Sequence, residues 1–487
     1  MKKLLALFMA VSMLFVSFAV ADAPAVESTV KEQFVPGQLV AYISNANARN
    51  AKVTEATQIL ETWGYTQTRR QLSFGEMTLK LYEAKDRSAA KNVVEAVRLF
   101  NSSMSREAQG VKLMPNYIFK INDNNDPCFN RKDIYRDREG NAHDVLLQWD
   151  MKNPGEFGGI ANSDLNATEA WKMIPENHEQ IIVAVVDSGV DTEHPGLKGR
   201  ILMKDGKPVG KDTTAWWGEG DHHDDHGHGS HCAGSIAAGY SDKEGMTGSS
   251  GPTNVKIISV KSMGKDGSGD LFSIGDGIKW AGAQGADIIS LSLGATPLFP
   301  EQEPILKEAF DDILNSPELK NAIPIAAAGN NGEDLHSFPA FCEKAIAIGA
   351  SDHQDKLATF SNFGTWVDVV SPGVNILSLR AKFKGKYVDM YRDAGYEKAE
   401  FAVGNGGAKD PYDNRAYYIA SGTSMATPNA AGVVAMLLAV NPKLKGNTQA
   451  VRKILMETSV KKGSFKIKEN SGRIDALEAV KAAKNFK

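Results

Sequence analysis

The chain has little cysteine and no excess of charge of either sign, and these shortages exclude several classes of protein. Three cysteines, Cys128, Cys232 and Cys342, occur in 487 residues, too few for a fold held together by disulfides. The net charge is −4, and no cluster of lysine and arginine alternates with aromatic residues. The composition therefore gives no reason to expect a nucleic-acid partner.

Long apolar runs are also scarce, and the one that stands out begins the chain. A basic start, Met1-Lys2-Lys3, precedes an almost unbroken apolar stretch over residues 4–20, and Ala19-Val20-Ala21 fits a cleavage site of small residues. This layout is that of a secretory signal peptide over residues 1–21. An uncleaved anchor is the alternative, but a spanning helix needs about 20 apolar residues. No later run is long enough to span, so we expect export and no membrane contact after signal cleavage.

The segment that follows has the pattern of a small mixed module, residues 22–122. Residues 39–43, 77–81 and 111–121 have the pattern of strands, whereas apolar residues recur at helical spacing over residues 53–63 and 93–100. Gly64 is the expected C-cap of the first helix. Two helices on an antiparallel sheet make an α+β module. A polar stretch of Asn and Asp then predicts an exposed linker before residue 128.

The remainder alternates short apolar runs with helical patterns. Beyond a mostly irregular extension over residues 128–180, with a short helix at 167–171, buried strands are expected at residues 181–186, 256–260, 287–293, 323–328 and 345–350. Helices are expected between them, at residues 271–283 and 305–315. This rhythm predicts an α/β fold with a mostly parallel sheet and helices on both faces.

Four positions carry the residue types that a nucleophilic mechanism requires. Asp187 and Asn330 directly follow predicted strands, where parallel sheets place their sites. His228 begins a run of small residues, and Ser424 precedes a predicted helix whose free N–H groups favour developing negative charge. Each also has an ordinary explanation, such as a turn aspartate or an N-cap serine. Their combination is the stronger signal.

The segments around these positions resemble the subtilisin-like serine proteases (subtilases). They are Val185-Val186-Asp187-Ser188-Gly189, His228-Gly229-Ser230-His231, Ala327-Ala328-Gly329-Asn330 and Gly422-Thr423-Ser424-Met425-Ala426-Thr427-Pro428. The resemblance implies that Ser424 is the nucleophile, His228 its general base and Asp187 the group that orients the base. It also implies that the Asn330 side chain and the Ser424 N–H bind the oxyanion. His231 is a competing base that spacing alone does not separate from His228.

The same resemblance implies a way of holding the substrate. Two segments would run beside an extended peptide as added strands, namely Gly267, Ser268, Gly269 and Ser292, Leu293, Gly294. Ser337 and Phe338 would contribute to the pocket wall. Residues 22–122 would be an inhibitor-like propeptide and residues 123–487 the peptidase domain. An unrelated module that stays attached is the alternative.

The implied partners are protein or peptide substrates and the chain's own propeptide. The protein is expected to be a monomer. The implied location is extracellular, or periplasmic if the cell has an outer membrane. A catalytically silent binding protein and a peptide ligase using the same acyl intermediate are the rival functions. Neither the physiological substrate nor the residue preferred before the cut is indicated.

Several features depart from the family pattern. Gly196 stands where several subtilases carry a calcium-binding aspartate. The acidic, histidine-rich loop 221–226 is a candidate for Ca²⁺ or a softer metal, with a solvated polar loop as its alternative. The metal ligands are therefore unknown: a structural calcium stays open, and the chemistry needs no cofactor.

Three further features have weaker interpretations. Cys232 is expected to be a buried free thiol, and Cys128–Cys342 is the one bridge worth testing, with three unpaired cysteines as the alternative. Asn429 stands where many relatives carry a histidine, and the sequence suggests no role for it. Residues 381–415 form a long polar insertion, of the kind that often serves as a lid or a specificity element.

Overall fold

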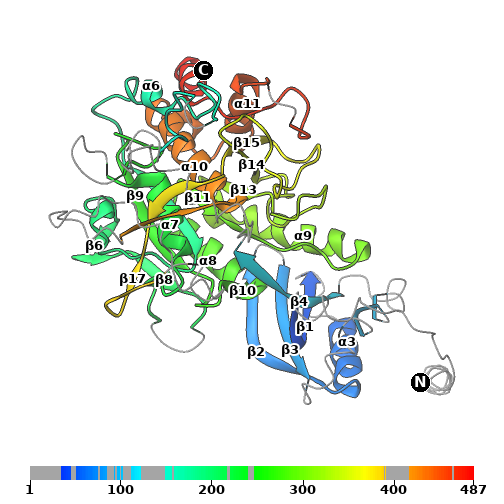
Figure 1. Cartoon of the computed structure of the whole chain (residues 1–487). Helices are drawn as coiled ribbons and strands as arrows, with labels where there is room; N and C mark the ends of the chain where they lie inside the picture. Colours follow the sequence, from blue (N-terminus) through cyan, green and yellow to red (C-terminus); the bar gives the residue numbers. More distant parts are fainter. Residues whose placement is uncertain are drawn as a thin grey trace.

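The computed structural model describes a defined part of the chain. The described residues are 34–44, 51–74, 77–84, 93, 96–98, 100–101, 111–121, 148–155, 158–215, 220–239, 246–388, 390, 416–462 and 465–487. The predicted signal peptide, the predicted linker, Cys128 and most of the 381–415 insertion lie outside these residues. Figure 1 shows the two parts described below, an N-terminal module in blue and a larger core in green to red.

A parallel sheet of seven strands forms the centre of the core. Its order, from one edge to the other, is β15 (Val369–Pro372), β14 (Ile346–Ser351), β13 (Ile323–Ala327), β11 (Ile288–Leu291), β5 (Ile181–Asp187), β9 (Val255–Lys261) and β8 (Gly210–Asp212). Every neighbouring pair is parallel. The order places β5, β11 and β13 side by side, so the residues that follow them meet at one edge of the sheet.

Helices cover both faces of this sheet because alternate strand residues are apolar on each side. Val183 and Val185 of β5 pack on one face, and Ala184 and Val186 pack on the other. The helices on the first face are α6 (Ala167–Trp171), α7 (His228–Ala237), α10 (Thr423–Val440), α11 (Thr448–Thr458) and α12 (Ala476–Asn485). Those on the second face are α8 (Leu271–Ala283) and α9 (Glu303–Leu314). The predicted α/β class is confirmed.

Short antiparallel pairs complete the described core. They are β6 (Met203–Lys204) with β7 (Lys207–Pro208), β16 (Ile376–Leu379) with β19 (Tyr417–Ala420), and β17 (Lys382–Phe383) with β18 (Lys386–Tyr387). Helical turns occur at Pro195–Leu197, Pro300–Gln302, Pro317–Leu319 and Pro442–Leu444.

Helix α10 is the one helix in the described part of the chain that is long and apolar enough to cross a membrane. The sequence had suggested that no run beyond the N-terminus was long enough. However, 94% of this helix is buried inside the protein. It is therefore the central helix of the core, and its apolar length reflects contact on all sides.

The N-terminal module is the antiparallel plait that the sequence predicts, with one strand more. Its sheet has the order β4 (Val111–Ile121), β1 (Phe34–Ser44), β3 (Met77–Ala84) and β2 (Tyr65–Phe74). Helix α3 (Ala51–Thr62) ends before Gly64, whose φ of 87° suits the predicted C-cap. Strand β2 was missed because six of its residues in succession, 66–71, are polar.

The two faces of the module's sheet have different partners. Leu39, Ala41 and Ile43 pack beneath the module's helical residues, including Leu60 and Phe100. The opposite face packs on α8 and α9 of the core, through Val40, Tyr42, Leu72, Met77, Leu79, Leu81, Met114 and Tyr117. In Figure 1 the module accordingly lies against these two helices.

Polar contacts surround that apolar interface. The Tyr42 hydroxyl donates to Asp312 Oδ2 at 2.6 Å, and Lys279 Nζ donates to the Ser73 carbonyl at 2.8 Å. Lys112 pairs with Glu308, and the Tyr117 hydroxyl contacts Gln302 Oε1. The module is thus held by a buried apolar face with a polar rim.

Candidate functional site

Asp187 and His228 form a buried pair at the carboxyl end of β5. His228 Nδ1 lies 2.7 Å from Asp187 Oδ1, and the two side chains are 0% and 1% exposed. The Ser188 N–H donates to the same carboxylate oxygen at 2.7 Å. A buried carboxylate needs such donors to stay ionised. The pairing fixes both the orientation of the imidazole and the proton on Nδ1.

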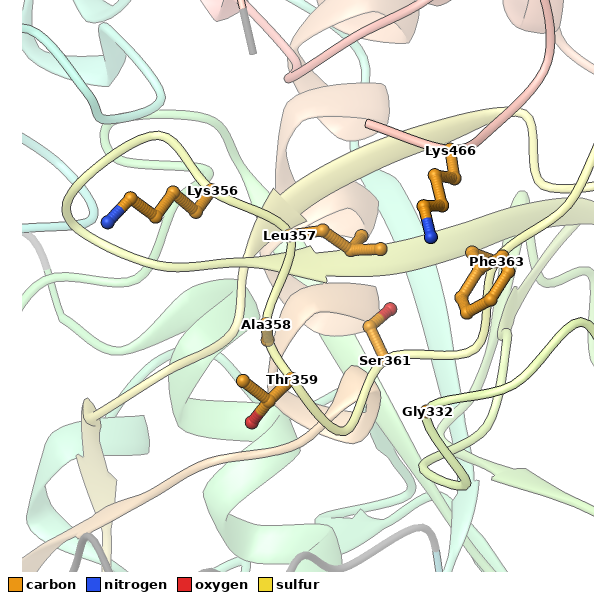
Figure 2. Close-up of a pocket in the computed structure, with 8 residues that line it drawn as sticks. All are labelled: Gly332, Lys356, Leu357, Ala358, Thr359, Ser361, Phe363 and Lys466. Carbon is orange, nitrogen blue, oxygen red and sulfur yellow. The ribbon is translucent and has the colours of Figure 1, made fainter. Parts of the chain in front are cut away.

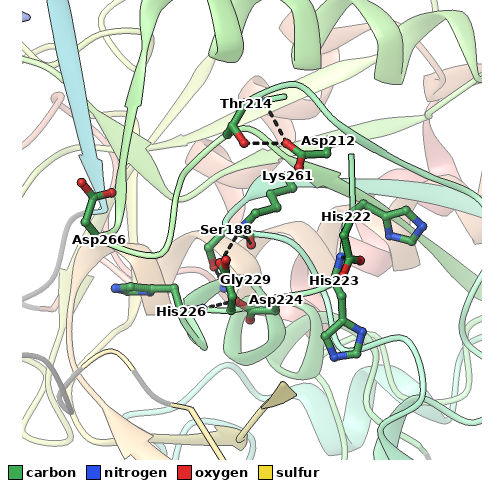
Figure 3. Close-up of polar contacts among 12 residues, drawn as sticks. Ser188, Asp212, Thr214, His222, His223, Asp224, His226, Gly229, Lys261 and Asp266 are labelled. Atoms are coloured by element: carbon green, nitrogen blue, oxygen red, sulfur yellow. Dashed lines mark hydrogen bonds and ion pairs between the residues drawn. The ribbon is translucent and has the colours of Figure 1, made fainter. Parts of the chain in front are cut away.

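Asp224 fixes the beginning of α7, the helix that starts at His228. Its Oδ1 accepts from Gly227 N at 2.7 Å, His226 N at 3.0 Å and Ser188 Oγ at 2.8 Å. Its Oδ2 accepts from Ser230 N at 2.8 Å. The side chain is fully buried, and Figure 3 shows it among these polar contacts. A carboxylate at a helix N-terminus satisfies free N–H groups and complements the helix dipole.

The loop around Asp224 does not bring its carboxylates and histidines to one point. Asp225 pairs with Lys261, and Asp221 accepts from the His223 N–H at 2.9 Å. The rings of His222, His223 and His226 point in different directions (Figure 3). Within the described residues, the one group of side chains close enough to share a metal is Asp187, His228 and Cys232. Asp224 is committed to the N–H groups at the beginning of α7, whereas Asp221 of the same loop is exposed.

Ser424 lies in the first turn of α10. Pro428, inside the helix and just past its first turn, has no N–H to donate to the carbonyl four residues earlier, which is that of Ser424. Ser292 Oγ donates to this carbonyl at 2.9 Å, and Cys232 Sγ contacts it at 3.5 Å. The proline therefore leaves an acceptor that side chains from two other elements satisfy.

The same thiol connects the candidate nucleophile to the candidate base. Cys232 Sγ lies 3.8 Å from His228 Nδ1 and 3.5 Å from the Ser424 carbonyl oxygen. Cys232 is a buried free thiol, as predicted, and burial raises its pKa. Ser424 Oγ donates to the Ser292 carbonyl at 3.1 Å. Asp187, His228 and Ser424, although far apart in sequence, thus meet at one place.

Asn330 lies beside the N-terminus of α10. Its Oδ1 accepts from the Thr423 N–H and from Thr423 Oγ1, both at 2.9 Å. Thr423 Oγ1 in turn accepts from the Gly329 N–H at 3.2 Å. Because both bonds go to the amide oxygen, the orientation of the planar amide is fixed, with its nitrogen directed away from Thr423.

The two histidines of the α7 segment have different surroundings. His231 is fully buried, with Nε2 3.1 Å from the Ile376 carbonyl, and burial together with His228 lowers its pKa to about 3. Burial lowers the pKa of His228, but Asp187 and Cys232 together outweigh it, so that pKa lies well above its ordinary value. Of these two histidines, His228 is the one that contacts Asp187, which favours His228 as the base.

A strand of the N-terminal module lies between the two predicted substrate-binding segments. β4 pairs with β10 (Ser268–Asp270) through Ser268–Lys120 and Gly269–Phe119, and with β12 (Leu293–Gly294) through Leu293–Ile121 and Gly294–Lys120. All these pairings are antiparallel. Gly267 precedes β10 with a φ of 68°, and Ser292 precedes β12. The two segments thus accept an extended chain as an added strand.

A separate open cavity of about 260 Å³ lies on the side of the Gly332 loop (Figure 2). It is lined by residues such as Gly332, Ser361, Phe363 and Lys466. Lys356 extends away from its centre in Figure 2, and its Nζ donates to Gln354 Oε1 at 2.9 Å. None of the predicted site residues lines this cavity. Phe338, a predicted pocket residue, is fully buried and bridges to Ala295.

Two uncertain sequence features have a definite structural outcome. Cys342 is a buried free thiol whose Sγ lies 3.9 Å from the Lys307 carbonyl, and Cys128, the other residue of the predicted bridge, lies outside the described residues. Asn429 is fully buried and donates to Asp150 Oδ2 at 3.0 Å. It therefore ties α10 to the extension that precedes the core.

Sequence reasoning missed the residues that support the site. The sequence offers Asp224 only as a metal ligand, because the N-cap position of α7 belongs to Gly227 and Asp224 lies three residues before it. The hydroxyl of Ser292 has no sequence signal of its own, because the family resemblance gives its segment a role for the backbone alone. Pro428 was the available signal, since a proline inside a helix requires another donor for the freed carbonyl.

Replacing Asp224 by alanine should destabilise the core and displace His228. It would leave the N–H groups of His226, Gly227 and Ser230, at the beginning of α7, without this acceptor, at a cost of about 1–3 kcal/mol each. We expect a loss of about 3 kcal/mol or more in the free energy of unfolding, measured by denaturant titration of the Ser424→Ala protein. The matched control is Asp221→Ala, an exposed residue of the same loop, which should change stability by roughly 0.5 kcal/mol or less. Equal effects of the two replacements would contradict the capping role.

Comparison with known proteins shows the family that the sequence motifs resemble. Residues 178–473, more than half of the chain, match the subtilase family. The cell wall-associated protease of Bacillus subtilis is 37% identical over 308 residues, which are 62% of this chain and 29% of that protein. Halolysin of Haloferax mediterranei is 31% identical over 356 residues, 72% of this chain and 58% of that protein. The chain thus spans less than two thirds of either relative.

Shorter and more distant relatives complete the comparison. Thermitase of Thermoactinomyces vulgaris is 31% identical over 316 residues, 65% of this chain and 93% of thermitase. The crystal structure of fervidolysin from Fervidobacterium pennivorans, a keratinolytic enzyme related to subtilisin, has a TM-score of 0.60 and 22% identity. The match covers 93% of this chain and 62% of the fervidolysin chain. An identity of 22% supports a shared fold alone. The family match and the coverage of thermitase lead to one conclusion: this chain belongs to the subtilase family.

Proposed function

We propose that this protein is a secreted serine endopeptidase that is made as a zymogen and processes itself. It hydrolyses peptide bonds of protein or peptide substrates through an acyl-enzyme intermediate. The observation that carries this proposal is the buried Asp187–His228 pair at 2.7 Å, set against Ser424 at the N-terminus of α10. The relatives that share this family support the reaction type.

Each residue has a role that its surroundings suit. Ser424 attacks the peptide carbonyl, and His228 takes the serine proton and passes it to the leaving amine. Asp187 holds Nδ1 of His228 and stabilises the imidazolium that forms. The oxyanion is bound by the Ser424 N–H and the Asn330 amide, whose orientation Thr423 fixes. None of these steps requires a cofactor.

We propose that the substrate peptide binds in the position that β4 occupies. A peptide would add a strand between residues 267–269 and residues 292–294, using backbone hydrogen bonds that accept many sequences. The residue after Ile121 in this register would lie opposite Ser292, whose carbonyl accepts from Ser424 Oγ. That residue is Asn122. We therefore propose that the bond after Asn122 is cut.

This register supports the proposed division of the chain. Residues 1–21 would be a signal peptide, residues 22–122 an inhibitory propeptide, and residues 123–487 the peptidase domain. The propeptide would help the slow-folding parallel sheet to form and then occupy the cleft as a product does. The mature enzyme would act as a monomer outside the cell, or in the periplasm where an outer membrane exists.

The rival functions are separated by two measurements. A fluorophosphonate probe should label the wild-type protein and leave Ser424→Ala unlabelled. If the protein were a catalytically silent binding protein, the wild type would not be labelled either. With a peptide substrate and an added amine acceptor, a peptide ligase would form the joined product. Hydrolysed products alone support the endopeptidase.

The wild-type protein and Ser424→Ala should have different N-termini after secretion. We expect the wild type to begin at Asp123, and in any case between Asp123 and Cys128, because Ser424 would cleave the segment of its own chain that follows β4. Ser424→Ala should accumulate in the longer form that begins near Asp22, and should not hydrolyse casein. Edman sequencing or intact mass of both proteins gives the result.

A control for this experiment is the addition of processed wild-type protein to the Ser424→Ala precursor. Conversion in that mixture would show that the precursor's linker is accessible and that only its own nucleophile is missing. If instead both secreted proteins begin at the same residue without any addition, another protease does the processing, or none occurs.

The pH dependence of hydrolysis should follow His228. A protonated imidazole cannot accept the serine proton, so kcat/KM should fall as the pH is lowered through the pKa of His228. Because Asp187 raises that pKa, the midpoint should lie above the ordinary value of 6.5. Asp187→Asn should move the midpoint to lower pH, since burial then dominates, and should lower the rate by about 10⁴-fold, as in other serine proteases. The control Asp221→Asn should leave the midpoint in place.

A further inference from the structure

The core carries a site for a guanidinium group, and the N-terminal module fills it. Arg70 of β2 donates from Nη1 to Asp270 Oδ2 at 2.6 Å and from Nη2 to Asp270 Oδ1 at 2.9 Å. The guanidinium carbon lies 4.9 Å from the centre of the Phe272 ring. The Arg70 and Asp270 side chains are only 13% and 16% exposed. A two-point carboxylate contact together with an aromatic face is a strong arrangement for binding arginine.

Asp270 is held in place by contacts that do not involve Arg70. It is the N-cap of α8, where its Oδ1 accepts from the Ser273 N–H at 2.9 Å. The Ser273 hydroxyl accepts from the Asp270 N–H at 3.0 Å, which completes a capping box. The carboxylate is therefore positioned by the core itself. It would keep its orientation after the module has left.

The strand in the cleft offers this carboxylate no ionic partner at the facing position. Asp270 is the partner of Ile118 in the β4–β10 ladder. Partner residues of an antiparallel pair project from the same face, with Cβ atoms about 5 Å apart. An isoleucine cannot pair with a carboxylate, and Asn116 of β4 reaches it only at 3.4 Å. The charge is instead neutralised by Arg70, from another strand of the module.

We propose that, after the module is released, Asp270 and Phe272 bind a basic side chain of the substrate at the fifth residue before the cut. This rests on the proposed function, in which the cut follows Asn122 and Ile118 is the fifth residue before it. A substrate arginine at that position would have its side chain beside Asp270 and would take the place of Arg70. Arginine is preferred to lysine, because its planar fork matches the carboxylate and the ring face.

The test uses the full-length chain, expressed and allowed to process, with four peptides that differ only at the fifth residue before the cut. These carry Arg, Lys, Leu or Glu. We expect kcat/KM for the Arg peptide to exceed that for the Leu peptide about ten-fold, the effect of one charge-assisted hydrogen-bonded contact. The Lys peptide should fall between them, and the Glu peptide below Leu.

Two matched variants separate the direct contact from the general field of the protein. Asp270→Asn removes the charge but keeps an effective N-cap for α8, and should reduce the Arg-to-Leu ratio to about one, the value expected with no charged contact. Asp276→Asn makes the same charge change on the same helix, at a side chain that is 44% exposed and pairs with Lys211. It should retain the preference for arginine.

Equal rates for the Arg and Leu peptides would overturn the proposal, as would a preference that survives Asp270→Asn. A preference lost equally in both variants would also overturn it, because a long-range field would then be the cause. These outcomes all require hydrolysis of the Leu peptide. If that hydrolysis is absent, or does not depend on Ser424, the proposed function itself is contradicted.

Discussion

The buried contact between Asp187 and His228 is the constraint on which the site depends. A carboxylate that is 1% exposed is stable only with nearby donors, and the donors here come from Ser188 and from the first residue of α7. The end of β5 and the start of α7 must therefore be placed together. Asp224 provides this by binding the α7 N-terminus and the Ser188 hydroxyl with one side chain. The imidazole is then oriented by the core as a whole.

Much of the core could be predicted from sequence because its parts have strong local signals. The apolar runs of β5, β9, β11, β13 and β14 and the pattern of α8 each appear where they were expected. The four candidate site positions could be identified because they follow predicted strands or begin predicted helices. Their order along the chain is also the order found in subtilases. The antiparallel plait was recognisable for the same reason, apart from the polar strand β2.

What escaped prediction depends on contacts between distant segments. Strands β8 and β15 have three and four residues, which is too few for a recognisable period. The partner of Asn429 is Asp150, 279 positions away, and no local pattern connects them. Arg70 lies in a polar run that resembles a solvated loop, yet its side chain is only 13% exposed and pairs with Asp270. Tertiary packing decided each of these cases.

Strand β4 pairs with both the module and the core, and under the proposed function this sharing would separate cleavage of the chain from the onset of activity. Its first part pairs with β1 inside the module, and its last part pairs with β10 and β12 of the core. If the chain is cut just beyond this strand, no hydrogen bond of either sheet is lost, so the cleft stays filled. Emptying it requires the module to detach as a folded unit or to unfold. The delay before activity would then be set by the stability of a domain whose core, around Leu39 and Phe100, touches no reacting atom.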